Sequence, residues 1–272
     1  MKIAAIQMVS APDLATNLAT AERLIDQAAA EGAQLISLPE YFVQMGLRET
    51  DKFEIAEEFG YGPIQEMLSA KARQYGIWVA GGSIPIKTQD PAKVTNTALL
   101  FNPQGEVLAR YDKMHLFSYQ DGTRNLDEGR TMVPGKERVM ADTPFGRIGL
   151  SICYDLRFPE LYRAMGEVNL ILVPSAFTVP TGSAHWSVLL RARAIENQCY
   201  VLAAAQGGTH VNGRQTYGHS MLIDPWGEVV SVLPQGEGVV MGEMDLERLK
   251  SVRHNLQALL HRRMSIESFI ET

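Results

Sequence analysis

Several classes of protein are excluded by what the 272-residue chain lacks. It has two cysteines, Cys153 and Cys199, and no Cys-x-x-Cys or His-Glu-x-x-His spacing that would hold a metal ion. It has neither the Gly-x-Gly-x-x-Gly loop nor the Walker-type loop that binds a nucleotide phosphate. We therefore expect a protein that uses no metal and no cofactor.

Positive charge and long apolar runs are also scarce. The formal net charge is −6 and the isoelectric point is near 5.6, which argues against nucleic acid or an anionic membrane surface as partner. No run of about 18 apolar residues could span a bilayer, and the apolar start of the chain is too short for a secretion signal. We expect a cytoplasmic protein, with its thiols reduced and with no membrane or nucleic-acid partner.

Short apolar segments rich in β-branched residues alternate with segments of helical periodicity. This alternation, with turn signals at residues 102–105 and 224–227 inside two hairpins, predicts a single α/β domain over residues 1–272. The predicted strands are residues 2–8, 35–38, 78–84, 97–101, 106–111, 147–153, 170–173, 200–205, 220–223 and 229–232. The predicted helices are residues 17–31, 64–75, 159–165, 186–197 and 245–260. The polar segment 118–135 is predicted to be a long loop without strands, which in a compact domain is often functional.

Cys153 is the first candidate for chemistry because of its position in the chain. A predicted apolar strand runs directly into it, and polar residues begin immediately after it. A turn of this kind exposes the thiol beside free backbone N–H groups, which can stabilise a thiolate and an oxyanion. A small buried core residue is the alternative, and it is the interpretation we favour for Cys199, which lies in the strand-like segment 198–205.

Glu40 and Lys113 also follow predicted apolar strands directly. Taken singly, each has a simpler interpretation as a solvated glutamate or a surface lysine. Because all three residues follow strands in the same orientation, we expect them to converge on one rim. A carboxylate can act as the base and an ammonium as the electrostatic stabiliser, so this group needs no Cys–His pair.

The segments around these three residues resemble the catalytic blocks of the nitrilase superfamily of carbon–nitrogen hydrolases. The blocks are, in the family's order, Leu38-Pro39-Glu40, Lys113 with His115-Leu116, and Cys153-Tyr154-Asp155-Leu156-Arg157-Phe158-Pro159-Glu160. Further matches at residues 174–177, 185–186, 191–194, 217–220 and 224–227 extend the similarity over nearly the whole chain. The segment 184–206 resembles the Nit branch in particular. The resemblance implies a four-layer α-β-β-α sandwich of the nitrilase type, and a homodimer or higher even oligomer whose sheets continue across the interface.

The resemblance also implies a role for each residue of the site. Glu40 is expected to take the proton of Cys153 and later to protonate the leaving group. Lys113 is expected to stabilise the oxyanion together with the backbone N–H after Cys153, while Glu128 orients Lys113. The ammonium is expected to lower the pKa of the thiol. Substrate contacts are expected from Tyr154, Arg157, Phe177, Thr178 and His185, although His185 and His219 could instead be buried structural histidines.

The implied reaction is hydrolysis of a small linear amide through a thioester intermediate. For the Nit branch the implied substrate is deaminated glutathione, which yields 2-oxoglutarate and cysteinylglycine. Such a substrate carries two carboxylates, for which Arg157, Arg124 or Arg130 could supply a bidentate contact, while Asp155 and Arg157 could instead pair and brace the turn. The alternatives are an ω-amidase acting on 2-oxoglutaramate, an N-carbamoyl hydrolase or nitrilase, and a non-catalytic interaction protein.

Overall fold

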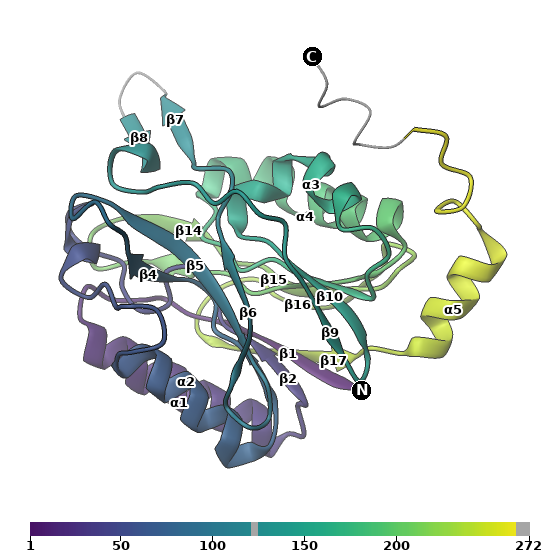
Figure 1. Ribbon diagram of the computed structural model, residues 1–272, viewed down its shortest axis with the longest axis horizontal. Helices are drawn as coiled ribbons and strands as arrows, with labels where there is room; N and C mark the ends of the chain where they lie inside the picture. The colour runs from purple at the N-terminus through teal and green to yellow at the C-terminus, as the bar shows by residue number, and fades with distance from the viewer. Residues whose placement is uncertain (121–124, 265–272) are drawn as a thin grey trace.

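Two β-sheets pack face to face, and a pair of helices covers the outer face of each sheet (Figure 1). The structure is a computed structural model that describes residues 1–120 and 125–264. It has the predicted α-β-β-α order of layers, with α1 and α2 on one side and α3 and α4 on the other. Within the described residues, no helix is both long enough and apolar enough to cross a membrane.

The first sheet has seven strands in the order β17-β1-β2-β3-β5-β4, with β6 paired to β5. Its centre is parallel, because β1 pairs with β2 and β2 with β3 in that sense. Side chains of β1 alternate between the two faces: Ile3 packs toward the second sheet and Ile6 toward the helices. The strands are β1 (Lys2–Gln7), β2 (Leu35–Ser37), β3 (Trp78–Ala80), β4 (Ile84–Lys87), β5 (Val94–Phe101), β6 (Val107–Asp112) and β17 (Gly238–Glu243).

The second sheet has six strands in the order β16-β15-β12-β11-β10-β9. Its centre, β10-β11-β12, is parallel, and strands β11 and β12 are fully buried and read as continuous apolar sequence. Cys199 is fully buried just before β12, as expected of a core residue. The strands are β9 (Met140–Thr143), β10 (Gly146–Leu150), β11 (Leu170–Leu172), β12 (Tyr200–Ala203), β15 (Ser220–Ile223) and β16 (Val229–Leu233), with a separate pair β13 (Gly207–Thr209) and β14 (Gln215–Tyr217).

The helices begin and end at the residues that local chemistry favours. The Asp13 side chain caps α1 by accepting the Thr16 N–H at 2.7 Å. Pro63 opens α2, and Gly76 ends it in the left-handed conformation at φ +63°. The helices are α1 (Leu14–Ala30), α2 (Pro63–Tyr75), α3 (Pro159–Ala164), α4 (Val179–Asn197) and α5 (Leu246–Asn255), with 3₁₀ turns η1 (Asp51–Phe53), η2 (Glu128–Arg130) and η3 (Cys153–Arg157).

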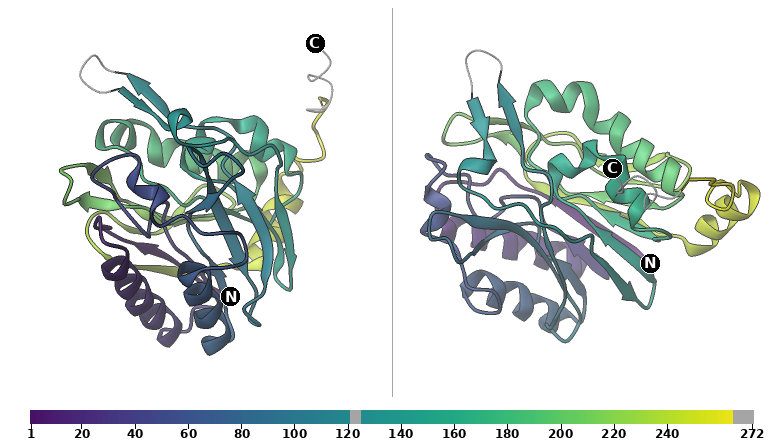
Figure 2. Two further views of the ribbon diagram at one scale, coloured as in Figure 1. Left: turned by 60° about the vertical axis from the view of Figure 1, so that its left-hand side comes forward. Right: turned by 45° about the horizontal axis from the view of Figure 1, so that its top comes forward.

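The prediction that segment 118–135 lacks strands is wrong. The segment contains the antiparallel strands β7 (Ser118–Gln120) and β8 (Asn125–Asp127), followed by η2, and the two strands project beyond both sheets (Figure 2). All three residues of β7 are exposed, so this strand has no buried face and shows no apolar alternation in the sequence. Its backbone pairing with β8 defines it.

Two helix boundaries were also predicted incorrectly. Helix α4 begins at Val179, well before residue 186, because Pro180 is tolerated in a first turn and Gly182 permits close packing on Tyr217. A Cβ added to Gly182 would lie 2.3 Å from the Tyr217 side chain. Helix α5 ends at Asn255 rather than 260, where Gln198 Nε2 donates to the Leu256 carbonyl at 2.6 Å. Both boundaries depend on tertiary contacts.

The predicted strand 78–84 is broken between β3 and β4, and the break shapes the segment that carries Glu40. Gly82 adopts φ +54°, and an added Cβ would lie 2.2 Å from the Pro39 carbonyl oxygen. The Ser83 N–H donates to that same oxygen at 3.3 Å, and Ser83 Oγ accepts the Tyr41 N–H at 3.3 Å. The chain on both sides of Glu40 is therefore held against this glycine turn.

Candidate active site

Glu40, Lys113 and Cys153 come together, but from two sheets. Glu40 follows β2 and Lys113 follows β6, both in the first sheet, whereas Cys153 follows β10 in the second. The sequence suggested convergence along one rim; the structure instead places the residues where corresponding ends of two packed sheets meet. Glu128 joins them from η2, at the base of the β7–β8 hairpin.

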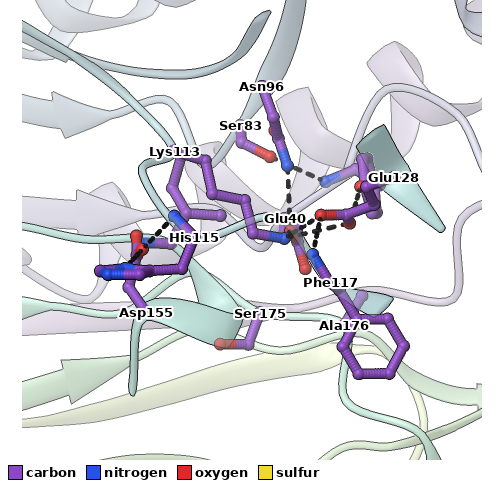
Figure 3. Close-up of polar contacts among 12 residues, drawn as sticks. Glu40, Ser83, Asn96, Lys113, His115, Phe117, Glu128, Asp155, Ser175 and Ala176 are labelled. Atoms are coloured by element: carbon purple, nitrogen blue, oxygen red, sulfur yellow. Dashed lines mark hydrogen bonds and ion pairs between the residues drawn. The ribbon is translucent and has the colours of Figure 1, made fainter. Parts of the chain in front are cut away.

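Lys113 lies between two carboxylates in the interior of the protein (Figure 3). Its Nζ is 2.9 Å from Glu40 Oε1 and 2.9 Å from Glu128 Oε2, and both Lys113 and Glu40 are only 1% exposed. Asn96 Nδ2 donates to Glu40 Oε1 at 3.0 Å. Glu128 accepts the Tyr41 hydroxyl at 2.5 Å and the Phe117 N–H at 2.8 Å. Each charge is thus paired and hydrogen-bonded, as a buried ion must be.

The two carboxylates keep Lys113 charged despite its burial. Burial by itself lowers the pKa of the ammonium, but Glu128 and Glu40 raise that pKa well above its usual value. Burial raises the pKa of Glu128, yet the adjacent Lys113 and the hydrogen bonds from Tyr41 and Phe117 bring it below its usual value. The site therefore holds a permanent cation with an ionised carboxylate beside it.

Cys153 occupies a strained position in the turn that follows β10. Its φ of +49° lies in the left-handed region, which non-glycine residues rarely adopt outside functional sites. Its N–H donates to the Pro174 carbonyl at 2.9 Å, which anchors the turn to the segment after β11. Within the described chain, the next backbone donor, the Tyr154 N–H, makes no hydrogen bond. That N–H is available to an oxyanion formed beside the sulfur.

Asp155 braces this turn, although it does not pair with Arg157. Its Oδ2 accepts the Ile152 N–H at 2.8 Å and the Tyr111 hydroxyl at 2.7 Å. Its Oδ1 accepts the His115 N–H at 3.0 Å and lies 2.7 Å from His115 Nδ1. Because Tyr111 and His115 flank Lys113, this carboxylate fixes the nucleophile turn relative to the ammonium.

The pKa of the Cys153 thiol is raised overall, although Lys113 lowers it as expected. Burial is the largest cause, and the Glu40 charge adds to it, while Lys113 and the Ala176 N–H oppose the shift. The charge of Glu40 acts on the thiol, and both groups line the same cavity. The resting group is therefore a neutral thiol close to a carboxylate.

A cavity of about 320 Å³ opens onto this group of residues. Four of the predicted substrate-binding residues line it: Tyr154, Arg157, Phe177 and Thr178. His185 does not line it; this side chain is exposed on α4, and its Nδ1 lies 3.2 Å from Arg157 Nη1. His219, beside β15, is half-buried, with Nδ1 2.9 Å from the Tyr217 carbonyl oxygen. Neither histidine is the buried structural residue that we considered as the alternative.

Other residues of the cavity were not found from the sequence. Tyr41, Phe117, Ala176, Thr181 and Arg214 complete its wall. Tyr41 could have been suspected, because it directly follows Glu40, but nothing in the sequence connects Arg214 to the cysteine. Of the two loop arginines considered, Arg130 is exposed near Asp127 and is absent from the wall, and Arg124 lies outside the described residues. In the described ranges, no cluster of three or more His, Cys, Asp or Glu side chains could hold a metal ion.

The buried ion cluster generates a test of stability. Lys113→Met removes the cation and leaves Glu40 and Glu128 facing each other, which should lower the free energy of unfolding by about 3–5 kcal/mol near pH 8. Without the cation the pKa of Glu128 rises, so proton uptake should relieve the repulsion, and the deficit should shrink toward about pH 5. Urea denaturation at both pH values measures this.

Lys71→Met is the matched control. Lys71 Nζ lies 2.6 Å from Asp26 Oδ1, but the Asp26 side chain is 42% exposed, so the loss should be about 1 kcal/mol or less. That loss should not depend on pH in this range. A Lys113→Met deficit that is as small as this, or that grows on acidification, would contradict the electrostatic description of the cluster.

Comparison with known proteins identifies the family. The carbon-nitrogen hydrolase family model matches residues 2–254. A deaminated glutathione amidase from Synechocystis is 43% identical over 265 residues, which cover 95% of this chain and 97% of that protein. The crystal structure of Caenorhabditis elegans NitFhit has a TM-score of 0.89 at 40% identity, covering 97% of this chain and 66% of that one. Saccharomyces cerevisiae Nit3, a nitrilase-superfamily member, has a TM-score of 0.87 at 31% identity, covering 97% of both chains. This chain belongs to the carbon-nitrogen hydrolase family of the nitrilase superfamily.

Proposed function

We propose that this enzyme hydrolyses the amide bond of deaminated glutathione through a thioester on Cys153. The observation that carries the proposal is the arrangement at the cavity floor. The protonated Cys153 thiol and the Glu40 carboxylate line the same cavity, and a buried ammonium lies 2.9 Å from that carboxylate. These groups supply a nucleophile, its base and a positive charge for an oxyanion.

Acylation follows from the positions of the groups. Glu40 takes the thiol proton as Sγ attacks the amide carbon, and the carbonyl oxygen becomes an oxyanion stabilised by Lys113 Nζ and the Tyr154 N–H. The oxyanion then reforms the carbonyl, the C–N bond breaks, and Glu40 returns the proton to the departing nitrogen. The products of this half-reaction are a thioester and a free amine.

Deacylation uses the same base with water as the nucleophile. Glu40 takes a proton from water as its oxygen attacks the thioester carbon, and the second tetrahedral oxyanion uses the same two donors. Collapse of this intermediate breaks the C–S bond, and Glu40 returns the proton to the sulfur. A carboxylic acid leaves, and the neutral thiol is restored. Glu128, through its contacts with Lys113, holds the ammonium in place during both steps.

The substrate assignment is supported by relatives and by charge. The Synechocystis and human relatives, 43% and 40% identical, are named deaminated glutathione amidases. The acyl part of that substrate ends in a 2-oxo carboxylate, and Arg157 provides a guanidinium in the cavity beside the Tyr154 and Phe177 rings. The mechanism also requires a reduced thiol, so we propose a cytoplasmic location, which cell fractionation would test.

Cysteine substitutions test the mechanism. Cys153→Ala and Cys153→Ser should lower kcat by at least about 1000-fold because each removes the nucleophile, and Glu40→Gln should lower it by about 100-fold or more by removing the base. Steady-state kinetics measure the losses, and circular dichroism confirms folding. Cys199→Ala is the control, since Cys199 is equally buried but remote from the cavity. Wild-type turnover by Cys153→Ala would contradict the mechanism.

A substrate comparison tests the assignment. The enzyme should hydrolyse deaminated glutathione with a kcat/KM at least about tenfold above that for 2-oxoglutaramate, a difference of about 1.4 kcal/mol in transition-state binding. Chromatography should detect 2-oxoglutarate and cysteinylglycine in equal amounts. The reverse preference would indicate an ω-amidase and would leave the cysteine mechanism intact.

We also propose that the enzyme is a homodimer or a higher even oligomer. Helix α4 exposes Val188 and Ile195, which are one heptad apart and therefore lie on the same face of the helix. Trp226, between β15 and β16, is 52% exposed. Burying such apolar side chains between subunits would be favourable. Light scattering at micromolar concentration should give an even multiple of the 30.1 kDa chain mass. A mass of one chain would contradict the proposal.

A further inference from the structure

Arg214 occupies a fixed position on the wall of the cavity. It lies at the end of the turn between β13 and β14, where its N–H donates to Asn212 Oδ1 at 2.9 Å and its carbonyl accepts the His210 N–H at 2.8 Å. Asn212 Nδ2 in turn donates to the Gly46 carbonyl at 2.7 Å, in a different segment of the chain. The arginine therefore projects from a braced turn, so little conformational entropy is lost when it binds a ligand.

The guanidinium of Arg214 is near the nucleophile and has no carboxylate partner. Nη2 lies 3.5 Å from the Ala176 carbonyl oxygen and Nη1 lies 3.7 Å from Met45 Sδ. Ala176 lines the same cavity as Cys153. Among residues 1–120 and 125–264, no Asp or Glu oxygen forms an ion pair with Arg214. A cation held by two weak neutral acceptors can still bind an anion.

Arg214 also connects the catalytic cavity to a second, outer cavity of about 900 Å³. Arg157 lines only the inner cavity, whereas Arg214, Tyr41, Phe117 and Glu128 line both. The inner cavity is small, so the part of a long substrate on one side of the scissile bond must extend into the outer one. The two arginines are therefore available to opposite ends of such a substrate.

The outer cavity contains a second cation, Lys52. Its Nζ donates to Thr131 Oγ1 at 2.9 Å and makes no ion pair within the described residues. Burial is the main cause that lowers the pKa of Lys52. The charges of Glu128 and Glu49 raise this pKa, whereas those of Lys113 and Arg214 lower it, so all of these charges share one electrostatic environment. The other cation, Arg48, is paired with Asp51 at 2.9 Å, and Glu128 is paired with Lys113. Asp127, which also lines the outer cavity, is paired with Arg130 at 3.7 Å, so among the lining residues without an ion pair Lys52 and Arg214 outnumber Glu49.

We infer that Arg214, assisted by Lys52, binds a carboxylate on the leaving group of the substrate. The preferred substrate class is then an amide whose amine component is itself anionic, such as the amide of a short peptide with a free C-terminus. Arg157 serves the acyl end, and Arg214 serves the amine end. This inference rests on the proposed amidase function. It identifies Arg214 and Lys52 as the residues that would distinguish a peptide leaving group from ammonia.

The test uses three substrates on the full-length enzyme. They are deaminated glutathione, the same molecule with its glycine carboxylate converted to a carboxamide, and 2-oxoglutaramate, whose leaving group is ammonia. In the wild type, the carboxamide change should lower kcat/KM by about 10- to 100-fold, because a charge-assisted contact is lost. In Arg214→Gln, kcat/KM for deaminated glutathione should fall by a similar factor, and the carboxamide change should then have little further effect.

Arg48→Gln is the matched control, because Arg48 lines the same outer cavity but is already paired with Asp51. It should leave the ratio of kcat/KM between deaminated glutathione and 2-oxoglutaramate unchanged, whereas Arg214→Gln should lower that ratio by about 10- to 100-fold. Equal losses on both substrates in Arg214→Gln, or full sensitivity to the carboxamide change in that variant, would overturn the inference. Failure of the wild type to hydrolyse any of the three substrates would instead overturn the proposed function.

Discussion

The burial of the Lys113 ammonium between two carboxylates is the constraint on which the rest of the site depends. Removing one charge from water costs several kcal/mol, so the arrangement is tolerable only when partners meet it at hydrogen-bonding distance. Here the partners of the ammonium come from two separate segments, Glu40 after β2 and Glu128 on η2, and Asn96 on β5 in turn donates to Glu40. The ion cluster therefore stabilises the one arrangement of the ends of β2 and β6 and of the base of the β7–β8 hairpin in which Lys113, Glu40 and Glu128 are all paired.

A second buried carboxylate links that cluster to the other sheet. Asp155 is fully buried, and it accepts hydrogen bonds both from the turn that carries Cys153 and from residues beside Lys113. The positive φ of Cys153 is a local strain that such contacts can hold in place. The distance between nucleophile and ammonium is thus set by hydrogen bonds between the two sheets, and not by either sheet alone.

Because the pKa of the Cys153 thiol is raised, the chemistry that we propose depends on the Glu40 carboxylate. A cysteine activated by an adjacent cation would rest as a thiolate, open to oxidation and alkylation. In this site the thiol stays protonated because burial and the Glu40 charge together outweigh Lys113. In the mechanism that we propose, attack requires transfer of the proton to Glu40, the same proton is available for the leaving nitrogen, and the ammonium is free to stabilise the oxyanion.

The sequence by itself determined the alternation of strands and helices and the strand ends that carry Glu40, Lys113 and Cys153. These follow from local periodicity and from the preference of polar groups for strand termini. The tertiary structure decided the rest: that the three residues come from two sheets, that α5 ends at Asn255, that an exposed hairpin precedes Glu128, and that Arg214 reaches the cavity. The thiol pKa also belongs to this group, because its direction depends on how deeply sulfur, carboxylate and ammonium are buried together. Burial and long-range contacts are properties of the folded chain, and no local pattern of residues encodes them.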